Sequence, residues 1–279
     1  MNIPRRRFIH LAGSAAALLV ASRVQAQTYP TRPVRVIVPF APGGPADIVA
    51  RLLTQKLGDH LGKQFYVENV AGAGGNLGMR AAARAAPDGY TLVLVSSSYM
   101  VNPSLYPHVP YDPAKDFVPV TLPAYAPNVL VASPSLPVKS VEQLAEFVKA
   151  NPGKLSFASA GMGTTPYLSG ELFKLSLGAD LVHVPFNGSA PAIQSTLGGH
   201  TQFAFVVLAP AVPHIREASL RGLAVLSAER SSALPDVPTI AEAGFPGQEA
   251  PTSSPLSSRW NPNAGPKLFA PPTSRLNCE

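Results

Sequence analysis

Short apolar runs alternate along most of the chain with segments whose apolar residues recur every three or four positions. The apolar runs predict strands at residues 34–40, 65–69, 91–97, 128–133, 154–159, 181–186, 201–207 and 221–227. The periodic segments predict helices at residues 46–61, 77–86, 141–150 and 167–178. This order of strands and helices predicts an α/β fold with mostly parallel sheets that are covered by helices on both faces.

Local signals add detail to these elements. Caps are predicted where a polar residue precedes a helix, namely Ser140 with Gln143 as a capping box, Asn76, and Thr165 with Pro166 in the first helical position. The unbroken apolar character of residues 91–97 predicts a fully buried strand. The proline-rich stretch 102–116 predicts a loop.

Two glycine-rich corners stand where a strand passes into a helix: FAPGGPAD at 40–47 and SAGMGTTP at 159–166. In open α/β sheets, ligands lie beyond the carboxyl ends of the strands, beside helix N-termini. There the free N–H groups and the helix dipole favour an anion. The alternative is that each corner is a plain tight turn. Two corners in matching contexts predict two lobes that share a cleft for a small carboxylate.

Four side chains at or near these corners have both a structural and a binding interpretation. Asp47 is either a first-turn residue favoured by the helix dipole or a contact to a ligand ammonium or hydroxyl group. Asn76 is a cap whose side chain could also face the cleft. Thr164 and Thr165 are caps first and hydroxyl donors to a carboxylate second.

Motifs for catalysis or cofactor binding fail on inspection. Neither corner has the lysine of a P-loop, and the G-x-G-x-x-G pattern breaks at Leu77 and at Pro166. A G-x-S-x-G nucleophile motif is missing, and the histidines lack metal-ligand spacing. The sequence therefore predicts neither an enzyme nor a cofactor or metal site.

Charge gives no support to a nucleic-acid partner. The chain has 22 basic and 16 acidic side chains, a net charge of +6, but residues 27–250 hold 15 of each. The excess lies at the two ends, so the folded body has no predicted basic face. The single cysteine, Cys278, excludes an intrachain disulfide.

Residues 1–26 have the pattern of an export signal. Arg5, Arg6 and Arg7 precede the short apolar run 11–21, and small residues close the segment. The apolar run is shorter than the about 20 residues of a membrane span, so no embedded segment is predicted. A Sec signal and a twin-arginine signal are both consistent with this pattern. We expect the mature chain to begin at Gln27 and to reside in the periplasm.

Seven motifs occur in an order typical of one family. They are YPTRPVRVIVPFAPGGPAD, VENVAGAGGNLG, PDGYTLVLVSS, YDPAKDFVPV, SAGMGTTP, LVHVPFNGSAPAI and LPDVPTIAEAGFPG. From about Tyr29 to Ala250 the chain closely resembles the Bug family of periplasmic solute receptors, the binding components of tripartite tricarboxylate transporters. The resemblance implies a type II periplasmic-binding-protein fold, a small carboxylate ligand and a membrane permease as partner, with a monomeric receptor.

The resemblance also implies lobe boundaries and a ligand site. It implies a first lobe of residues 27–123 plus 228–250 and a second lobe of 124–227, with hinges at 123–127 and 227–230. The implied ligand-binding residues are Phe40, Pro42, Gly43, Gly44, Asp47 and Asn76 in the first lobe, and Ser159, Gly161, Thr164, Thr165 and Asn187 in the second.

Departures from the family pattern leave the ligand's identity open. Tyr167 stands where histidine is frequent, Asn187 where a basic residue is common, and Val206 where an acidic residue is usual. Residues 251–279 contain six prolines and five serines and lack any helical or strand period. We interpret this tail as an out-of-frame sequence that replaces missing C-terminal elements, with a naturally divergent tail as the alternative. A non-functional remnant, or a ligand sensor that docks on a histidine kinase, remains an alternative to transport.

Overall fold

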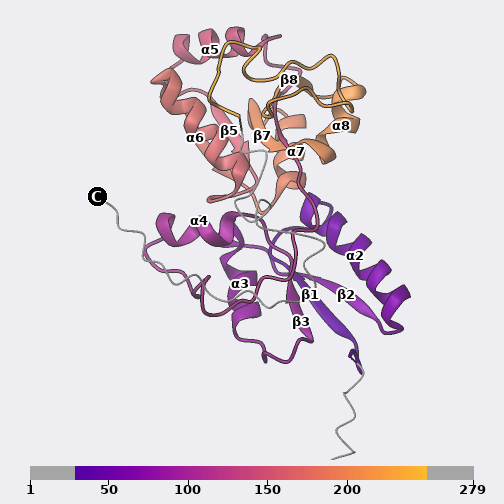
Figure 1. The fold of residues 1–279 in the computed structure, drawn as a ribbon. Helices are drawn as coiled ribbons and strands as arrows, with labels where there is room; N and C mark the ends of the chain where they lie inside the picture. The colour runs from indigo at the N-terminus through magenta and orange to yellow at the C-terminus, as the bar shows by residue number, and fades with distance from the viewer. Residues whose placement is uncertain (1–28, 250–279) are drawn as a thin grey trace, which may run out of the picture.

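The computed structural model describes residues 29–249, which form two α/β lobes (Figure 1). The predicted signal segment 1–26 and the predicted out-of-frame tail 251–279 lie outside the described residues. Among the helices that are described, none combines the length and apolar character that a membrane crossing requires. The two-lobed α/β architecture predicted from the sequence is confirmed.

The first lobe is built on a three-stranded parallel sheet with the order β2-β1-β3. Its strands are β1 (Val34–Val38), β2 (Phe65–Asn69) and β3 (Thr91–Val93). Its helices are α2 (Pro45–Leu61), the short 3-10 helix η1 (Ala73–Gly75), α3 (Asn76–Ala83) and α4 (Ser98–Leu105). Val34, Val36 and Val38 of β1 form a small core with Phe40, with Ala50 of α2 and with Phe65 of β2.

The second lobe has a five-stranded mixed sheet with the order β6-β5-β7-β4-β8, in which β4 runs antiparallel to β7 and β8. Its strands are β4 (Asn128–Ala132), β5 (Ser156–Ser159), β6 (Val182–Pro185), β7 (Phe203–Val207) and β8 (Arg221–Val225). Its helices are α5 (Val141–Ala150), α6 (Thr165–Leu177), α7 (Ser189–Leu197) and α8 (Leu208–Arg216). Apolar side chains of α5 and α6 pack on one face and those of α7 and α8 on the other, so both faces are covered.

Some local predictions were wrong. The strand predicted at 91–97 is only three residues long and half-buried, because β3 is an edge strand of the described sheet. The predicted loop 102–116 begins inside α4, which contains Pro103 in its last turn. Thr164, and not Thr165, caps α6, and α3 begins at Asn76 after Gly75. Ser140 does cap α5, because its Oγ accepts a hydrogen bond from the N–H of Gln143 (3.2 Å).

Residues 228–249 pack on the second lobe, which corrects their assignment to the first. After β8 the chain turns back, and Thr239 forms a parallel bridge with Val225. Leu234 and Val237 join the core on one face of the larger sheet, while Ile240 joins the core on the other face. The segment 228–249 wraps around the β8 edge of that sheet, which buries these apolar side chains.

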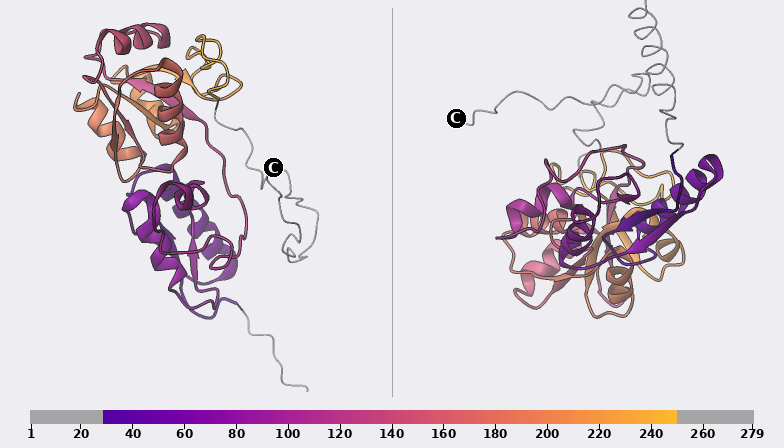
Figure 2. Two further views of the ribbon diagram at one scale, coloured as in Figure 1. Left: turned by 90° about the vertical axis from the view of Figure 1, so that its left-hand side faces the viewer. Right: turned by 90° about the horizontal axis from the view of Figure 1, so that it is seen from below.

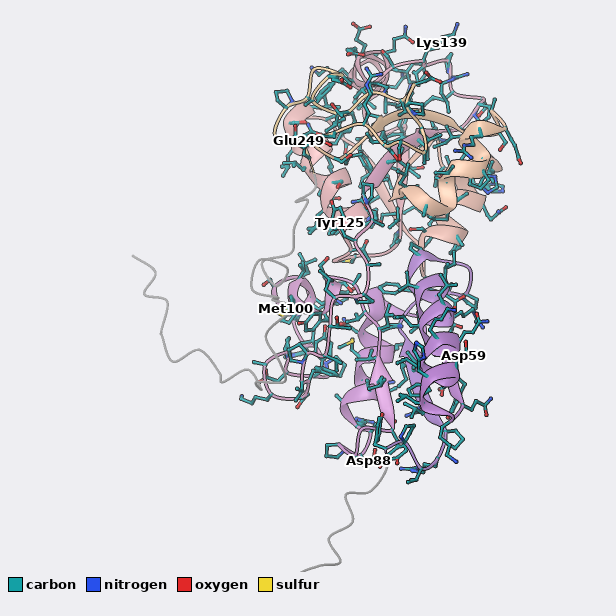
Figure 3. The ribbon with its side chains drawn as sticks, turned by 45° about the vertical axis from the view of Figure 1, so that its right-hand side comes forward. Asp59, Asp88, Met100, Tyr125, Lys139 and Glu249 are labelled. Carbon is teal, nitrogen blue, oxygen red and sulfur yellow. The ribbon has the colours of Figure 1, made fainter. Side chains whose placement is uncertain are left out.

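The described chain passes from the first lobe to the second through an extended segment that follows α4. This segment lies alongside the two lobes (Figure 2), and Tyr125 marks the level at which they meet (Figure 3). It contains no helix or strand between residues 106 and 127. Val118 and Val120 within it are 87% and 80% exposed. Hinge motion at 123–127 remains a prediction.

Candidate functional site

The carboxyl ends of all described strands except β4 point toward the boundary between the lobes. In the second lobe, β5, β6, β7 and β8 end at the edge where the antiparallel β4 begins, and α6 starts from that edge. Backbone contacts join the lobes there: the N–H of Ala41 donates to the carbonyl of Asn187 (2.7 Å). The first corner therefore contacts the loop that contains Asn187, and the shared carboxylate cleft between the two glycine-rich corners stays a prediction.

Glycine is required at two positions where the lobes approach each other. Gly74 of η1 has φ +63°, and a Cβ there would lie 2.5 Å from the carbonyl oxygen of Met162. Gly163 has φ +78°, and a Cβ there would overlap Oδ1 of Asn102. Side chains at either position would hold the lobes apart.

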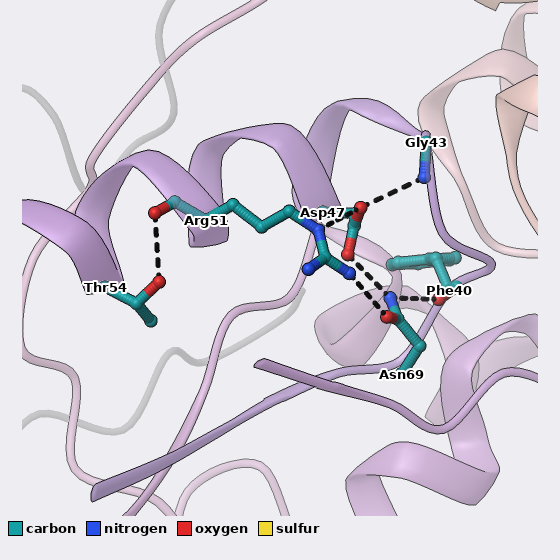
Figure 4. A network of polar contacts seen from close by, with 6 residues as sticks. All are labelled: Phe40, Gly43, Asp47, Arg51, Thr54 and Asn69. Atoms are coloured by element: carbon teal, nitrogen blue, oxygen red, sulfur yellow. Dashed lines mark hydrogen bonds and ion pairs between the residues drawn. The ribbon is translucent and has the colours of Figure 1, made fainter. Parts of the chain in front are cut away.

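Asp47 anchors the first corner from inside. It lies in the first turn of α2 and is only 3% exposed. Its Oδ2 accepts hydrogen bonds from the N–H of Gly43 (3.0 Å) and Nε of Arg51 (2.9 Å), and its Oδ1 accepts from Nδ2 of Asn69 (2.9 Å) (Figure 4). Burial alone would raise the pKa of Asp47, but the hydrogen bonds from Arg51, Gly43 and Asn69 outweigh it and hold this pKa below its usual value.

These bonds fix the conformation of the corner. Asn69, at the end of β2, also donates from Nδ2 to the carbonyl of Phe40 (3.1 Å). Phe40 and Gly44 are buried, whereas Pro42 and Gly43 are exposed. The carboxylate of Asp47 therefore already occupies the positive end of α2, and the N–H of Gly43 is already engaged.

Asn76 is buried, and its side chain is held within the first lobe. Its Oδ1 accepts a hydrogen bond from Nδ2 of Asn102 (2.8 Å), which also donates to the carbonyl of Gly74 (3.0 Å). Asn102 is fully buried on α4 and lies against Gly163 of the other lobe. Sequence reasoning missed Asn102 because the prolines around it indicated a loop.

The second corner is held by neutral groups. The Oγ of Ser159, at the end of β5, accepts a hydrogen bond from the N–H of Gly161 (3.1 Å) and pairs with Nε2 of His183 (2.7 Å). The His183 ring lies between the rings of Phe157 and Tyr167, at centroid distances of 4.9 and 4.8 Å. Burial, with a contribution from the charge of Lys174, lowers the pKa of His183 to about 4. This serine is fully buried, so the pair braces the corner.

Unpaired donors collect at the start of α6. Thr164 donates from Oγ1 to the carbonyl of Gly161 (2.6 Å) and caps the helix by accepting from the N–H of Tyr167 (3.4 Å). The backbone N–H groups of Met162, Gly163 and Thr165 have no hydrogen-bond partner within residues 29–249. Free N–H groups at the positive end of a helix favour an anion.

Asn187 lies at the boundary between the lobes. Its side chain is exposed, and its backbone carbonyl contacts the first lobe. Sequence reasoning also missed His183, whose register opposite Phe157 was not readable from spacing. Within the described part of the chain, no group of three or more histidine, cysteine or acidic side chains has a geometry that could hold a metal ion.

The chain is similar in sequence and in structure to proteins of one known family. Residues 49–259 match the family model described as tripartite tricarboxylate transporter family receptor. The protein BugT of Bordetella pertussis is 44% identical over 229 residues, which cover 81% of this chain and 70% of BugT. MatC from Rhodopseudomonas palustris, solved with bound malate, is 38% identical with a TM-score of 0.74, covering 80% of this chain and 76% of MatC. An R. palustris protein solved with adipate is 37% identical with a TM-score of 0.75, covering 80% of this chain and 75% of that protein.

Proposed function

The chain belongs to the tripartite tricarboxylate transporter receptor family, and we propose that it is a periplasmic receptor that binds a small carboxylate for a transporter of this type. Binding, and not catalysis, is its proposed activity. The R. palustris relatives with malate and adipate support a carboxylate as the ligand class. A membrane permease of the tripartite type is the proposed partner, with the receptor acting as a monomer.

The observation that carries this function is the set of unpaired N–H groups at the start of α6, where Met162 and Gly163 lie close to residues of the first lobe. A carboxylate seated there would accept from Met162, Gly163 and Thr165. Closure of the lobes would then bring the first corner, residues 40–44, over the ligand. Desolvation by the facing lobe would strengthen each of these hydrogen bonds.

The predicted ligand-binding residues fall into two groups under this proposal. Residues that present backbone or side-chain groups at the lobe boundary would contact the ligand, namely Phe40, Pro42, Gly43, Gly44, Thr165 and Asn187. Residues whose polar atoms are satisfied inside the protein would shape the site, namely Asp47, Asn76, Ser159, Gly161 and Thr164.

A ligand titration monitored by thermal melting tests the receptor function. Malate, succinate and adipate are each added to the purified protein, with malamide, the neutral diamide of malate, as the matched control. A ligand at 100 times its Kd adds about 2.7 kcal/mol to the unfolding free energy. At about 2–4 °C per kcal/mol, the melting temperature should rise by about 5–11 °C. No shift with any of the acids, or an equal shift with malamide, would refute carboxylate binding through this site.

The transport role has a separate test. Deletion of the gene in its host should abolish uptake of the acid that shifts the melt, and restoration of the gene should recover it. Uptake that is unchanged while the acid-responsive gene expression is lost would instead favour the sensor role. Unchanged uptake and unchanged expression would point to a remnant.

A further inference from the structure

Asn128 lies at the same sheet edge as the start of α6, although it is distant in sequence. It is the first residue of β4 and pairs with Val207, the last residue of the antiparallel β7. Side chains alternate along a strand, so Asn128 shares the face of Leu130, which packs in the core formed with α5 and α6. Its carboxamide therefore lies beneath the first turn of α6.

The carboxamide of Asn128 has a buried donor without a partner. The residue is only 1% exposed, and its Nδ2 finds no hydrogen-bond partner among residues 29–249. Its Oδ1 accepts a hydrogen bond from Oγ1 of Thr165 (3.4 Å), which is the first residue of α6. The threonine hydroxyl thus occupies the oxygen and leaves the buried N–H₂ group of Asn128 without a partner, next to the first residue of α6.

A buried donor without a partner destabilises the protein, so it calls for an acceptor in the functional state. We propose that Asn128 is a ligand-binding residue whose Nδ2 donates to the carboxylate held at the start of α6. This role rests on the proposed receptor function and extends it. The seat on the second lobe then consists of three backbone N–H groups and one carboxamide, all of them neutral.

The chemistry of this seat defines which end of a ligand it accepts. Nδ2 is a donor only, so it favours a carboxylate oxygen and disfavours an ammonium or amide nitrogen. Replacement of the carboxamide by a carboxylate at Asn128 would face the ligand with a second anion in a buried site. The two carboxylates would repel each other, and removing both charges from water would cost free energy.

Isothermal titration of malate and adipate into the full chain and its variants tests this role. We expect Asn128→Asp to weaken the Kd of the acid that binds by about 10- to 100-fold, the loss typical of a hydrogen bond to a charged group. Asn151→Asp is the matched control, because this variant makes the same chemical change at the end of α5. There Nδ2 of Asn151 donates a hydrogen bond to the carbonyl of Phe147. This control should retain the affinity of the wild type.

A second pair of variants decides the question should Asn128→Asp not fold. Asn128→Ala removes the Nδ2 donor without adding a charge and should weaken the Kd by about 10-fold, whereas Asn151→Ala, which also removes a carboxamide donor, should keep the affinity of the wild type. Equal affinities for Asn128→Asp and Asn151→Asp, or for Asn128→Ala and Asn151→Ala, would overturn the role of Asn128 while the receptor function stands. No binding of either acid to the wild type would overturn both.

Discussion

The two glycine-rich corners look alike in sequence, but the structure stabilises them in different ways. The first corner is held by a buried charge, since the carboxylate of Asp47 accepts from Gly43, Arg51 and Asn69. The second is held by neutral groups, the Ser159–His183 pair and the Thr164 cap. The first corner thus carries its own anion at the helix N-terminus, whereas the second keeps that place free.

This difference indicates that the two lobes would contribute to ligand binding in different ways. Because Asp47 already compensates the positive end of α2, the proposed ligand carboxylate would be attracted mainly by the N-terminus of α6. The first lobe would act as a rigid, pre-formed wall that closes over the ligand. Breaking each corner in turn should therefore affect stability in the first lobe and affinity in the second.

The largest expected effect on stability comes from Asp47→Ala. Loss of three hydrogen bonds to a buried carboxylate should lower the unfolding free energy by about 2–3 kcal/mol, or about 4–12 °C in melting temperature. The partner Arg51 has a side chain that is 57% exposed, so Arg51→Ala should lower the unfolding free energy by less than Asp47→Ala does. Urea melts of both variants measure the two losses of unfolding free energy. Equal losses would show that the ion pair with Arg51 stabilises the corner and that the hydrogen bonds of Asp47 to Gly43 and Asn69 do not.

Gly163→Ala should separate lobe closure from folding. The new Cβ would overlap Oδ1 of Asn102 only when the lobes are in contact, so the Kd for the ligand should weaken by about 10-fold. Gly178→Ala is the control, because Gly178 also has positive φ (+58°) but no atom within 4 Å of the added Cβ. Both variants should lose about 1 kcal/mol of unfolding free energy. A Kd that is unchanged in Gly163→Ala would exclude closure at this contact.

The two corners should also lose stability in different pH ranges. The pKa of His183 falls from 6.5 to about 4 on folding, so the unfolded chain binds a proton more readily than the folded one between these values. The contribution of neutral His183 is therefore complete above pH 6.5 and is lost as pH falls toward 4. Asp47 has a lowered pKa, so its contribution is lost only below the ordinary carboxyl value of 3.8.

Urea melts between pH 7 and pH 4.5 measure the histidine contribution. We expect His183→Gln to flatten the decline in unfolding free energy over this range, whereas His60→Gln, on the exposed end of α2, should leave the decline as in the wild type. Parallel curves for the wild type and His183→Gln would show that His183 does not cause the decline.

The smallest expected effect is a gain in stability from Gly58→Ala in α2. A Cβ there would lie 3.4 Å from the carbonyl oxygen of Lys63, and alanine is favoured over glycine in a helix by about 0.5–1 kcal/mol. Gly62 ends the same helix at φ +67°, so Gly62→Ala should lose stability instead. Thermal melts check both signs, and a loss in Gly58→Ala would indicate a tighter contact at Lys63.

Local patterns along the chain were enough to predict the alternation of strands and helices and the family. Helix α2 and strand β2 follow their predicted bounds closely because apolar periodicity, glycine stops and caps are local signals. The same signals failed at α4, where Pro103 lies in the last turn and local chemistry indicated a loop.

Tertiary structure alone decided how the site is built. Asn69 reaches Asp47 across 22 residues, Ser159 meets His183 across 24, and Thr165 meets Asn128 across 37. Residues 228–249 likewise joined the second lobe because their apolar side chains are buried on both faces of its sheet. Such contacts depend on which strands become neighbours, and periodicity within a segment carries no information about that choice.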